Sequence, residues 1–346
     1  MTETMQRIAL ARRPVGTPAD EDFLLESIPM PTPAEGEVLV EVHYMSLDPY
    51  MRGRMDDAKS YANPVPLGGT MEGGAVGQVV ATNAADFAAG DYVFGMLGWA
   101  SHACIKAKEL RKLDPKLAPI TTALGVLGMP GFTGWYGLME LGRPKAGETL
   151  VVAAATGPVG SMVGQVAKAR GLRTVGIAGG AEKCALAVEK FGFDVCLDHK
   201  EYADARAMRA AIAEQCPKGV DIYFENVAGK IFEAVLPLMN VGGRIPLCGL
   251  ISWYNAGALG ANAGGERDNL PKLWRTILVS RLSVNGFIIS DHWDRYVDFL
   301  RDVGPMLAKG QITYQEDITE GLENAPRAFM GLLNGENFGK QIVKVG

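Results

Sequence analysis

A glycine turn near the middle of the chain is the first place where residue types and spacing suggest chemistry. An apolar run, Leu150–Ala155, leads into Thr156-Gly157-Pro158-Val159-Gly160, after which small and apolar residues recur at helical spacing. Strand, glycine turn and helix is the order in which a parallel α/β sheet holds a dinucleotide, because the free N–H groups of the helix's first turn face the phosphates. Gly157 would let the backbone approach a pyrophosphate, and Gly160 and Gly164 would let the helix pack close to the strand. The pattern A-x-x-G-x-x-G is weaker than G-x-G-x-x-G, so an ordinary strand-to-helix turn is the alternative.

The next expected strand, Arg173–Ala178, ends without an acidic residue. NAD-selective sites usually place Asp or Glu there, about 20 residues after the glycines, to hold the ribose 2′-hydroxyl. Here Ala178-Gly179-Gly180 leads to Lys183. Open space and a cation suit a 2′-phosphate, so the sequence favours NADP(H) over NAD(H). The plainer interpretation of Lys183 is a solvated lysine at the start of a helix.

Strands and helices alternate around this turn, which predicts a doubly wound parallel sheet. The expected strands are Leu150–Ala155, Arg173–Ile177, Val195–Asp198, Ile222–Asn226, Gly243–Cys248 and Ser283–Phe287. The expected helices are Ser161–Arg170, Glu182–Phe191, Tyr202–Cys216, Lys230–Met239 and Leu270–Ser280.

The residues before and after this region predict a second, β-rich domain. Short alternating runs at Phe23–Ile28, Glu37–Ser46, Gly74–Thr82, Tyr92–Trp99 and Ser101–Ala107 suggest a compact β-barrel. The pattern turns helical around Leu124–Leu141, Asp291–Lys309 predicts one long amphipathic helix, and the tail predicts a helix over Glu323–Leu333 and a strand over Lys340–Val345. If that last strand returns to the β domain, the parallel sheet is an insertion. The expected domains are 1–125 with 315–346, and 126–314.

Composition is that of an ordinary globular protein. The 346 residues are 48% hydrophobic and 21% charged, with a net charge of −5, which disfavours a nucleic-acid or anionic-membrane surface. The five cysteines include no C-x-x-C pair and indicate reduced thiols. The first residues lack the apolar run of a signal peptide, and no run of 18 apolar residues occurs, so we expect a cytoplasmic protein without a membrane partner.

Six motifs now carry a family resemblance that covers nearly the whole chain. In order they are SLDPYMRGRM (Ser46–Met55), LGMPGFTGWYGL (Leu127–Leu138), AAATGPVG (Ala153–Gly160), DIYFENVAG (Asp221–Gly229), GLISWYN (Gly249–Asn255) and LNGENFGKQIV (Leu333–Val343). Together they resemble the zinc-independent medium-chain dehydrogenase/reductases of the leukotriene B4 dehydrogenase and prostaglandin reductase type, most strongly the bacterial NADPH-dependent curcumin reductases. The resemblance implies a GroES-like catalytic domain with an inserted Rossmann domain, a homodimer, and NADPH-dependent reduction of the C=C bond of α,β-unsaturated carbonyls.

The residues themselves argue against a metal. Zinc-dependent relatives use a cysteine, a G-H-E segment and a further ligand, but the corresponding segment here, Gly69–Gly74, reads GTMEGG. None of the four histidines has ligand spacing with a cysteine. We therefore expect no metal, and a zinc-dependent alcohol dehydrogenase is disfavoured.

Reduction of an enone requires hydride at the β-carbon, stabilisation of the enolate oxygen and a proton at the α-carbon. Without zinc, donors such as tyrosine hydroxyls must meet the oxygen and supply the proton. Tyr254 follows a strand end, where ligands of parallel sheets bind, although it could also be a packing residue. By resemblance Tyr61 is the candidate that meets the substrate carbonyl, and Tyr50 shapes the pocket; a surface-loop role for Tyr61 and a packing role for Tyr50 stay open. Arg52 and Arg54 are expected to form ion pairs rather than phosphate contacts.

The resemblance also places a set of cofactor contacts. These are Gly157, Pro158, Val159 and Gly160 at the pyrophosphate, Lys183 at the 2′-phosphate, Asn226 at a strand end, Cys248, Gly249, Leu250, Ile251, Ser252, Trp253 and Tyr254 along the nicotinamide half, Phe287, Ile288 and Ile289 beside the nicotinamide, and Asn337 from the tail. Asn226 could instead cap a turn. His199 stands where leukotriene-type members have a tyrosine near the adenosine. It could stack on adenine or donate to the 2′-phosphate.

A glycine- and alanine-rich segment, Ala256–Arg267, replaces a proline-rich one of related chains and could act as a lid or be a tolerant surface loop. The main interpretation is an NADPH-dependent reductase of curcumin-like enones and enals. A quinone reductase and a non-catalytic NADPH-binding regulatory protein remain as alternatives. A strand around Val279–Phe287 could pair across two subunits.

Overall fold

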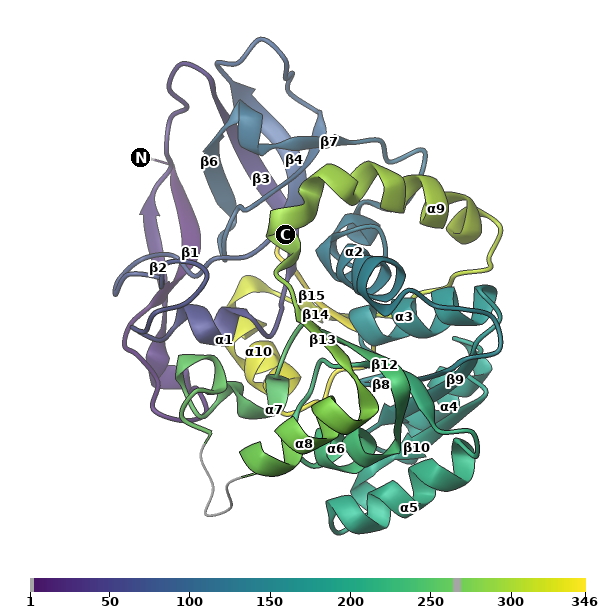
Figure 1. Cartoon of the computed structure of the whole chain (residues 1–346). Coiled ribbons are helices and arrows are strands. Elements are labelled where there is room, and N and C mark those ends of the chain that lie inside the picture. Colours follow the sequence, from purple (N-terminus) through teal and green to yellow (C-terminus); the bar gives the residue numbers. More distant parts are fainter. Residues whose placement is uncertain (1–2, 264–268) are drawn as a thin grey trace. The chain divides into compact units, whose positions relative to one another are not determined.

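The computed structural model describes residues 3–263 and 269–346, which form two compact units (Figure 1). Unit 1 comprises Met1–Gly125, Tyr254–Asn262 and Glu316–Gly346, and unit 2 comprises Val126–Trp253 and Ala263–Gln315. The chain passes from unit 2 to unit 1 within the short helix α7 (Ile251–Tyr254). Part of the candidate lid, residues 264–268, lies outside the described residues.

A parallel sheet with the order β10-β9-β8-β11-β12-β13 is the centre of unit 2. The central strand β8 sends Leu150 and Val152 into one buried cluster and Val151 and Ala153 into another, so both faces of the sheet are covered. The strands are β8 (Thr149–Ala153), β9 (Arg173–Ala178), β10 (Val195–Asp198), β11 (Val220–Phe224), β12 (Met239–Leu247) and β13 (Ser283–Gly286). The predicted doubly wound sheet is confirmed.

The helices of unit 2 begin at local signals in the sequence. Helix α3 has Gly157 as its N-cap and Pro158 in its first turn, where a missing N–H costs nothing. The Asp204 side chain caps α5 by accepting a hydrogen bond from the Ala207 N–H at 2.8 Å. The helices are α2 (Met129–Tyr136), α3 (Pro158–Ala169), α4 (Ala181–Glu189), α5 (Ala205–Gln215), α6 (Gly229–Val235), α8 (Leu270–Ser280) and α9 (Tyr296–Ala308).

The single long helix predicted over Asp291–Lys309 is wrong in its first turns. A 3-10 segment spans Ile289–Arg295, and its His292 has non-helical angles, φ −128° and ψ 21°. The Tyr136 ring stacks on His292 with centroids 4.3 Å apart, and Phe132 stacks on Trp293 at 5.4 Å. Because these aromatic contacts hold the kink, the regular helix starts only at α9.

Unit 1 contains a sheet with the order β14-β15-β3-β4-β5-β7, in which β6 also pairs with β3, and a separate β1-β2 hairpin. The last strand pairs with β3, where Ile342 faces Ser46, so the end of the chain returns to the N-terminal part as predicted. The elements are β1 (Thr4–Leu10), β2 (Phe23–Pro29), β3 (Glu37–Ser46), α1 (Met51–Arg54), β4 (Ala75–Thr82), β5 (Tyr92–Gly95), β6 (His102–Lys106), β7 (Arg111–Leu113), β14 (Glu316–Glu320), α10 (Ala325–Leu333) and β15 (Lys340–Lys344).

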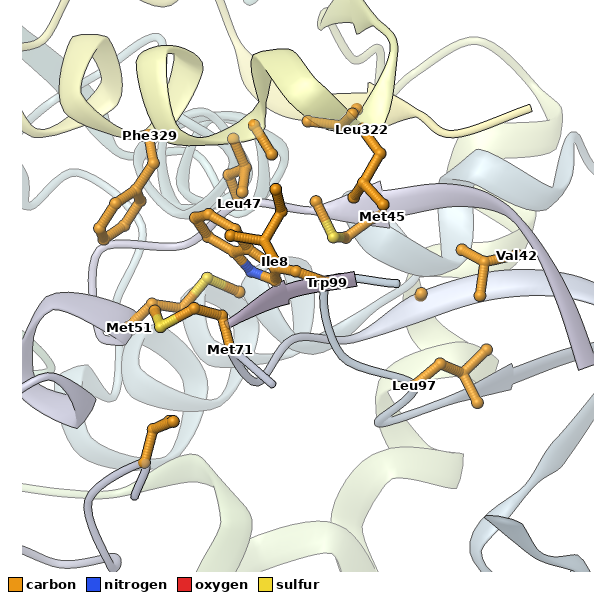
Figure 2. Close-up of a cluster of buried hydrophobic side chains, with 14 of the residues drawn as sticks. Ile8, Val42, Met45, Leu47, Met51, Met71, Leu97, Trp99, Leu322 and Phe329 are labelled. Atoms are coloured by element: carbon orange, nitrogen blue, oxygen red, sulfur yellow. The ribbon is translucent and has the colours of Figure 1, made fainter. Parts of the chain in front are cut away.

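Figure 2 shows the apolar core that supports α1 in unit 1. Trp99 is fully buried, stacks on Phe23 at 5.7 Å and meets the edge of Phe329 from α10 at 5.5 Å. Met51, the first residue of α1, is also fully buried in this cluster, beside Met71. The core therefore fixes the short helix that carries Arg52 and Arg54.

A buried ion pair joins β15 to the chain just before α1. The Lys340 ammonium donates to the Leu47 carbonyl at 2.6 Å and to the Asp48 carboxylate at 2.9 Å, and both charged side chains are at most 8% exposed. The Ser46 hydroxyl donates to the other Asp48 oxygen. Burial lowers the pKa of Lys340, and Asp48 opposes that shift. Both Asp48 oxygens and two of the three Lys340 N–H donors are therefore hydrogen-bonded, which offsets part of the cost of burying the charges.

Candidate functional site

The glycine turn of unit 2 joins β8 directly to α3. The Gly157 N–H donates to the Ala154 carbonyl at 2.9 Å, which closes the turn. A Cβ on Gly160 would lie 2.3 Å from the Ala154 carbonyl oxygen, so only glycine permits this approach of helix and strand. A Cβ on Gly164 would meet the Phe193 ring at 2.0 Å, so the close contact of Gly164 is with this ring, not with the strand as predicted. The first turn of α3 is left with N–H groups that have no acceptor inside the helix.

Basic groups gather beyond the end of β9. Lys183 of α4 is 8% exposed, so it is not the solvated lysine of the alternative interpretation. The imidazole of His199 lies against Gly179, whose Cβ would be 2.9 Å from His199 Nε2. Lys230 donates to the carbonyls of His199 and Tyr202 at 2.8 and 2.7 Å. Burial and the Lys230 charge lower the pKa of His199, so its ring is neutral at pH 7. The arrangement suits an anionic group with several negative charges.

An unsatisfied acceptor lies at the end of β11. The Asn226 amide donates to the Ala153 carbonyl at the end of β8, 2.9 Å away. Its side-chain oxygen is buried and has no hydrogen-bond partner among the described residues. A buried amide oxygen normally has a partner, so this atom marks a place where a bound donor fits. Asn226 therefore connects the segment after β11 to the end of β8.

Glu225, beside Asn226, was not singled out in the sequence. Its carboxylate is buried and accepts the N–H groups of Val227 and Ala228, each at 2.8 Å. Ala228 has φ +72°, a left-handed conformation that an alanine adopts only when its surroundings hold it there. Burial raises the pKa of Glu225, and the two N–H groups oppose that shift. The signal available in the sequence was an acid inside an otherwise apolar strand end, IYFEN.

The turn shaped by Glu225 supports the Cys248–Tyr254 segment. The Cys248 N–H donates to the Glu225 carbonyl at 3.0 Å, and the Ser252 N–H donates to the Val227 carbonyl at 3.0 Å. Burial raises the pKa of Cys248, so it is a neutral thiol and not a nucleophile. The remaining predicted members of the segment, Gly249, Leu250, Ile251 and Trp253, lie in the same turn and in α7.

The residues after β13 lie beside α2. The Phe287 N–H donates to the Leu247 carbonyl at 3.2 Å, and the Phe287 ring is 5.7 Å from the ring of Tyr136. Ile288 and Ile289 lead into the kinked 3-10 segment. The predicted contacts of unit 2 thus follow the ends of β8 to β13, because parallel strands present their carboxyl ends on one edge of the sheet.

Two of the three candidate tyrosines meet around one arginine in unit 1. The Arg54 guanidinium lies 4.4 Å from the ring centroid of Tyr61 and 5.6 Å from that of Tyr50. Its Nε donates to Glu72 at 2.5 Å. Burial, Asp48 and Glu72 raise the pKa of Tyr50 well above its usual value, so its hydroxyl stays protonated. The prediction that Arg54 forms an ion pair is confirmed, and Arg52 likewise pairs with Asp56 at 2.6 Å.

Tyr254 begins the segment Tyr254–Asn262 of unit 1. The Ala258 N–H of this segment donates to the Asp56 carboxylate at 2.9 Å, which fixes the segment to the end of α1. Asn337, the predicted contact from the tail, donates to the Gly339 carbonyl at 2.7 Å. Among the described residues, no group of three or more His, Cys, Asp or Glu side chains could hold a metal ion. No helix in that part of the chain is both long and apolar enough to cross a membrane.

Two family models match the chain, "N-terminal domain of oxidoreductase" over residues 6–113 and "Zinc-binding dehydrogenase" over residues 158–302. The NADPH-dependent curcumin reductase of Escherichia coli is 52% identical over 98% of this chain and 96% of its own length. This chain belongs to the medium-chain dehydrogenase/reductase family. Within that family it is an NADP-dependent oxidoreductase of the curcumin and prostaglandin reductase type.

Two further relatives support the membership of this chain in the medium-chain dehydrogenase/reductase family. Bovine prostaglandin reductase 1 is 39% identical over 95% of this chain and 96% of its own. The crystal structure of CurA in complex with NADPH from Vibrio vulnificus matches with a TM-score of 0.92 and 51% identity, over 99% of both chains. The predicted fold class, a GroES-like domain with an inserted Rossmann domain, is therefore confirmed.

Proposed function

We propose that this reductase uses NADPH to reduce the C=C bond of α,β-unsaturated ketones and aldehydes, including extended conjugated ones such as curcumin. The observation that carries the proposal is the pair of tyrosines, Tyr50 and Tyr61, packed on the buried guanidinium of Arg54. These phenol groups supply O–H donors for an enolate oxygen in a zinc-independent site. The names of the relatives, curcumin reductase, 2-alkenal reductase and prostaglandin reductase, support the same substrate class.

The residues of unit 2 fit NADPH. Gly157, Pro158, Val159 and Gly160 would hold the pyrophosphate, since α3 begins there with N–H groups that lack internal acceptors. Lys183 and His199 would receive the 2′-phosphate. Asn226 would accept a donor from the cofactor at its unpartnered oxygen. The Cys248–Trp253 segment and Phe287–Ile289 would line the nicotinamide half. Two residues of unit 1, Tyr254 and Asn337, are further proposed contacts of the cofactor. When bound, the cofactor supplies the hydride.

The tyrosines would hold and move the proton. Tyr61 would donate to the substrate oxygen and then supply the proton for the α-carbon, because its hydroxyl belongs to a half-exposed side chain that water can reprotonate. Tyr50 would remain protonated and shape the pocket, since burial keeps its pKa high. Tyr254 would line the substrate pocket, held by the Asp56–Ala258 contact.

A substrate panel tests the proposed function. The purified, metal-stripped protein would be mixed with NADPH and an enal, an aryl enone, curcumin or a quinone, and separately with NADP⁺ and a simple alcohol. NADPH absorbance and product mass would be recorded. We expect saturated ketone or aldehyde from the enones and enals, without added zinc. Turnover of the quinone alone would favour a quinone reductase, and tight NADPH binding with no turnover would contradict an enzyme of this specificity.

Replacing Lys183 by alanine should weaken NADPH binding without weakening NADH binding. Losing one charge-assisted contact to a phosphate costs about 1.5–3 kcal/mol, or roughly 10- to 150-fold in affinity. The measurement is the KM for each cofactor. Lys190→Ala, at the other end of α4, is the matched control, because Lys190 bonds to Gln315 and should leave both constants unchanged. Equal losses for NADPH and NADH would remove Lys183 from the 2′-phosphate site.

We also propose a homodimer formed through α8 and β13. Trp274 and Leu278 on α8 are 62% and 77% exposed, Val284 on β13 is 44% exposed, and β13 is the last strand of its sheet. An edge strand beside exposed apolar side chains is the surface that a second copy would cover.

Trp274→Asp should dissociate this dimer, because it would bury an unpaired carboxylate in the interface. Light scattering after size-exclusion chromatography would show the mass fall to that of one chain. Leu117→Asp is the control, since Leu117 is 85% exposed elsewhere, in unit 1. A wild-type chain that is already a monomer would refute the dimer.

We propose a cytoplasmic location as well. All five cysteines are free thiols, and such thiols persist unpaired in a reducing compartment.

A further inference from the structure

Arg54 is almost fully buried, and its ion pair uses only part of its hydrogen-bonding capacity. Its side chain is 5% exposed, and its Nε donates to Glu72 at 2.5 Å. Its Nη1 is buried and has no hydrogen-bond partner among the described residues. A guanidinium has five donors, and leaving one buried and unused costs free energy. The unused donor indicates that this arginine serves something besides its ion pair.

The nearest aromatic neighbour of Arg54 is Tyr61. The guanidinium carbon lies 4.4 Å from the centroid of the Tyr61 ring, well inside the range of a cation–π contact. The loop that carries Tyr61 is closed by a hydrogen bond from the Val65 N–H to the Arg54 carbonyl, 2.8 Å long. Arg54 therefore contacts both the ring of Tyr61 and the base of its loop.

We propose that Arg54 positions Tyr61 and stabilises the negative charge that Tyr61 carries after it gives its proton to the substrate. This inference rests on the proposed function and adds to it the residue that makes Tyr61 an effective acid. When bound, NADPH would supply the hydride for the β-carbon of the enone. The Tyr61 O–H bond breaks as the α-carbon takes the proton, and the tyrosinate then regains a proton from water. The unused Nη1 donor is available to the oxygen that bears this charge.

The charged groups around Tyr61 shift the pKa of its hydroxyl in opposite directions. Burial and Glu72 raise the pKa of Tyr61, whereas the Arg54 cation lowers it. Asp48 and Tyr61 also raise the pKa of the neighbouring Tyr50, whose ring centroid lies 5.6 Å from the Arg54 guanidinium carbon, and Arg54 lowers it. Removing the Arg54 charge would leave Tyr61 facing the Glu72 carboxylate alone. Its pKa would then rise, because the cation that favours the tyrosinate is gone.

Arg54→Gln tests the proposal with two independent readouts. The first needs no substrate: tyrosinate absorbance is titrated in the wild type and in Tyr61→Phe, and the difference gives the pKa of Tyr61. We expect Arg54→Gln to move that difference curve to higher pH, Arg54→Lys to keep it near the wild type, and Glu72→Gln to move it to lower pH. An unmoved curve in Arg54→Gln would overturn the proposal. If Arg54→Gln does not fold, an unmoved curve in Glu72→Gln would overturn it instead.

The second readout is a double-mutant cycle on kcat for an aryl enone. If Arg54 acts through Tyr61, Arg54→Gln should lower kcat about 10- to 100-fold in the wild type but change it little in Tyr61→Phe, because residues that act as a unit are not additive. A full additional loss in Tyr61→Phe would contradict the proposal. Arg7→Gln is the matched control: Arg7 pairs with Glu26 at 2.7 Å in the same unit, and kcat should not change. Absence of enone turnover in the wild type would refute the proposed function, while the absorbance titration would still decide the role of Arg54.

Discussion

Tyr61→Phe is expected to lower kcat for enone reduction by about 100- to 10,000-fold, the usual contribution of a positioned acid. The variant keeps the ring that packs on Arg54 at 4.4 Å and removes only the O–H group. Loss of activity would therefore report the proton and the donor, not the packing. NADPH affinity should stay the same, because the residues proposed to bind the phosphates belong to unit 2.

Two further tyrosine variants make this result specific. Tyr254→Phe should raise KM more than it lowers kcat, since Tyr254 is proposed to line the pocket. Tyr92→Phe should behave as the wild type, because the Tyr92 ring meets His43 at 6.0 Å and has no proposed role. If kcat instead collapses in Tyr254→Phe and survives in Tyr61→Phe, Tyr254 is the acid and the role given to Tyr61 is wrong.

Lys340→Met should lower the free energy of unfolding by about 3–5 kcal/mol, the usual cost of removing one partner of a buried ion pair. The change leaves the Asp48 carboxylate, which is 8% exposed, with only the Ser46 hydroxyl and no cation. It also removes the donor of the Leu47 carbonyl. Denaturant unfolding followed by circular dichroism would measure the loss.

Two further variants distinguish the effect of losing a buried charge from the effect of losing a lysine side chain. Lys344→Met, on the same strand, removes a lysine that is 40% exposed and pairs with Glu320 at 3.2 Å, and it should cost about 0–1 kcal/mol. Lys340→Met combined with Asp48→Leu should recover part of the stability, because an apolar pair can replace a buried ion pair. Equal losses in Lys340→Met and Lys344→Met would show that the buried pair contributes no more than a surface one.

The sequence alone predicted those strands and helices whose own residues show a clear apolar pattern. Strand Val195–Asp198 and helix Leu270–Ser280 coincide with β10 and α8, because an apolar run or an amphipathic period is visible without knowing the neighbours. Strand β14 reads EDITE and has almost no apolar signal, and its conformation depends on parallel pairing with β15. Strand β1 was missed too, although it pairs along its whole length with β2.

Some features of the candidate site could likewise be predicted from the sequence, and others could not. The glycine turn could be predicted because the close approach of Gly160 to the Ala154 carbonyl is local in sequence. The environment of Arg54 could not, because it depends on Glu72 and on a loop that folds Tyr61 back over α1. The kink at His292 was equally hidden, since it is held by Tyr136 from a distant helix.

Strand β3 lies near the start of the sequence and its partner β15 near the end, so the two strands are synthesised far apart in time. The last residue of unit 2, Gln315, leaves the ribosome before β15, so the edge of β3 at Tyr44–Ser46 stays unpaired until Lys340–Lys344 emerge. An open strand edge is a template for wrong pairing and a target for chaperones and proteases. A chain that ends before Lys340 would lack both that strand and the ammonium that neutralises Asp48. Strand β3 of unit 1 therefore gains its β15 partner only after all of unit 2 has been made.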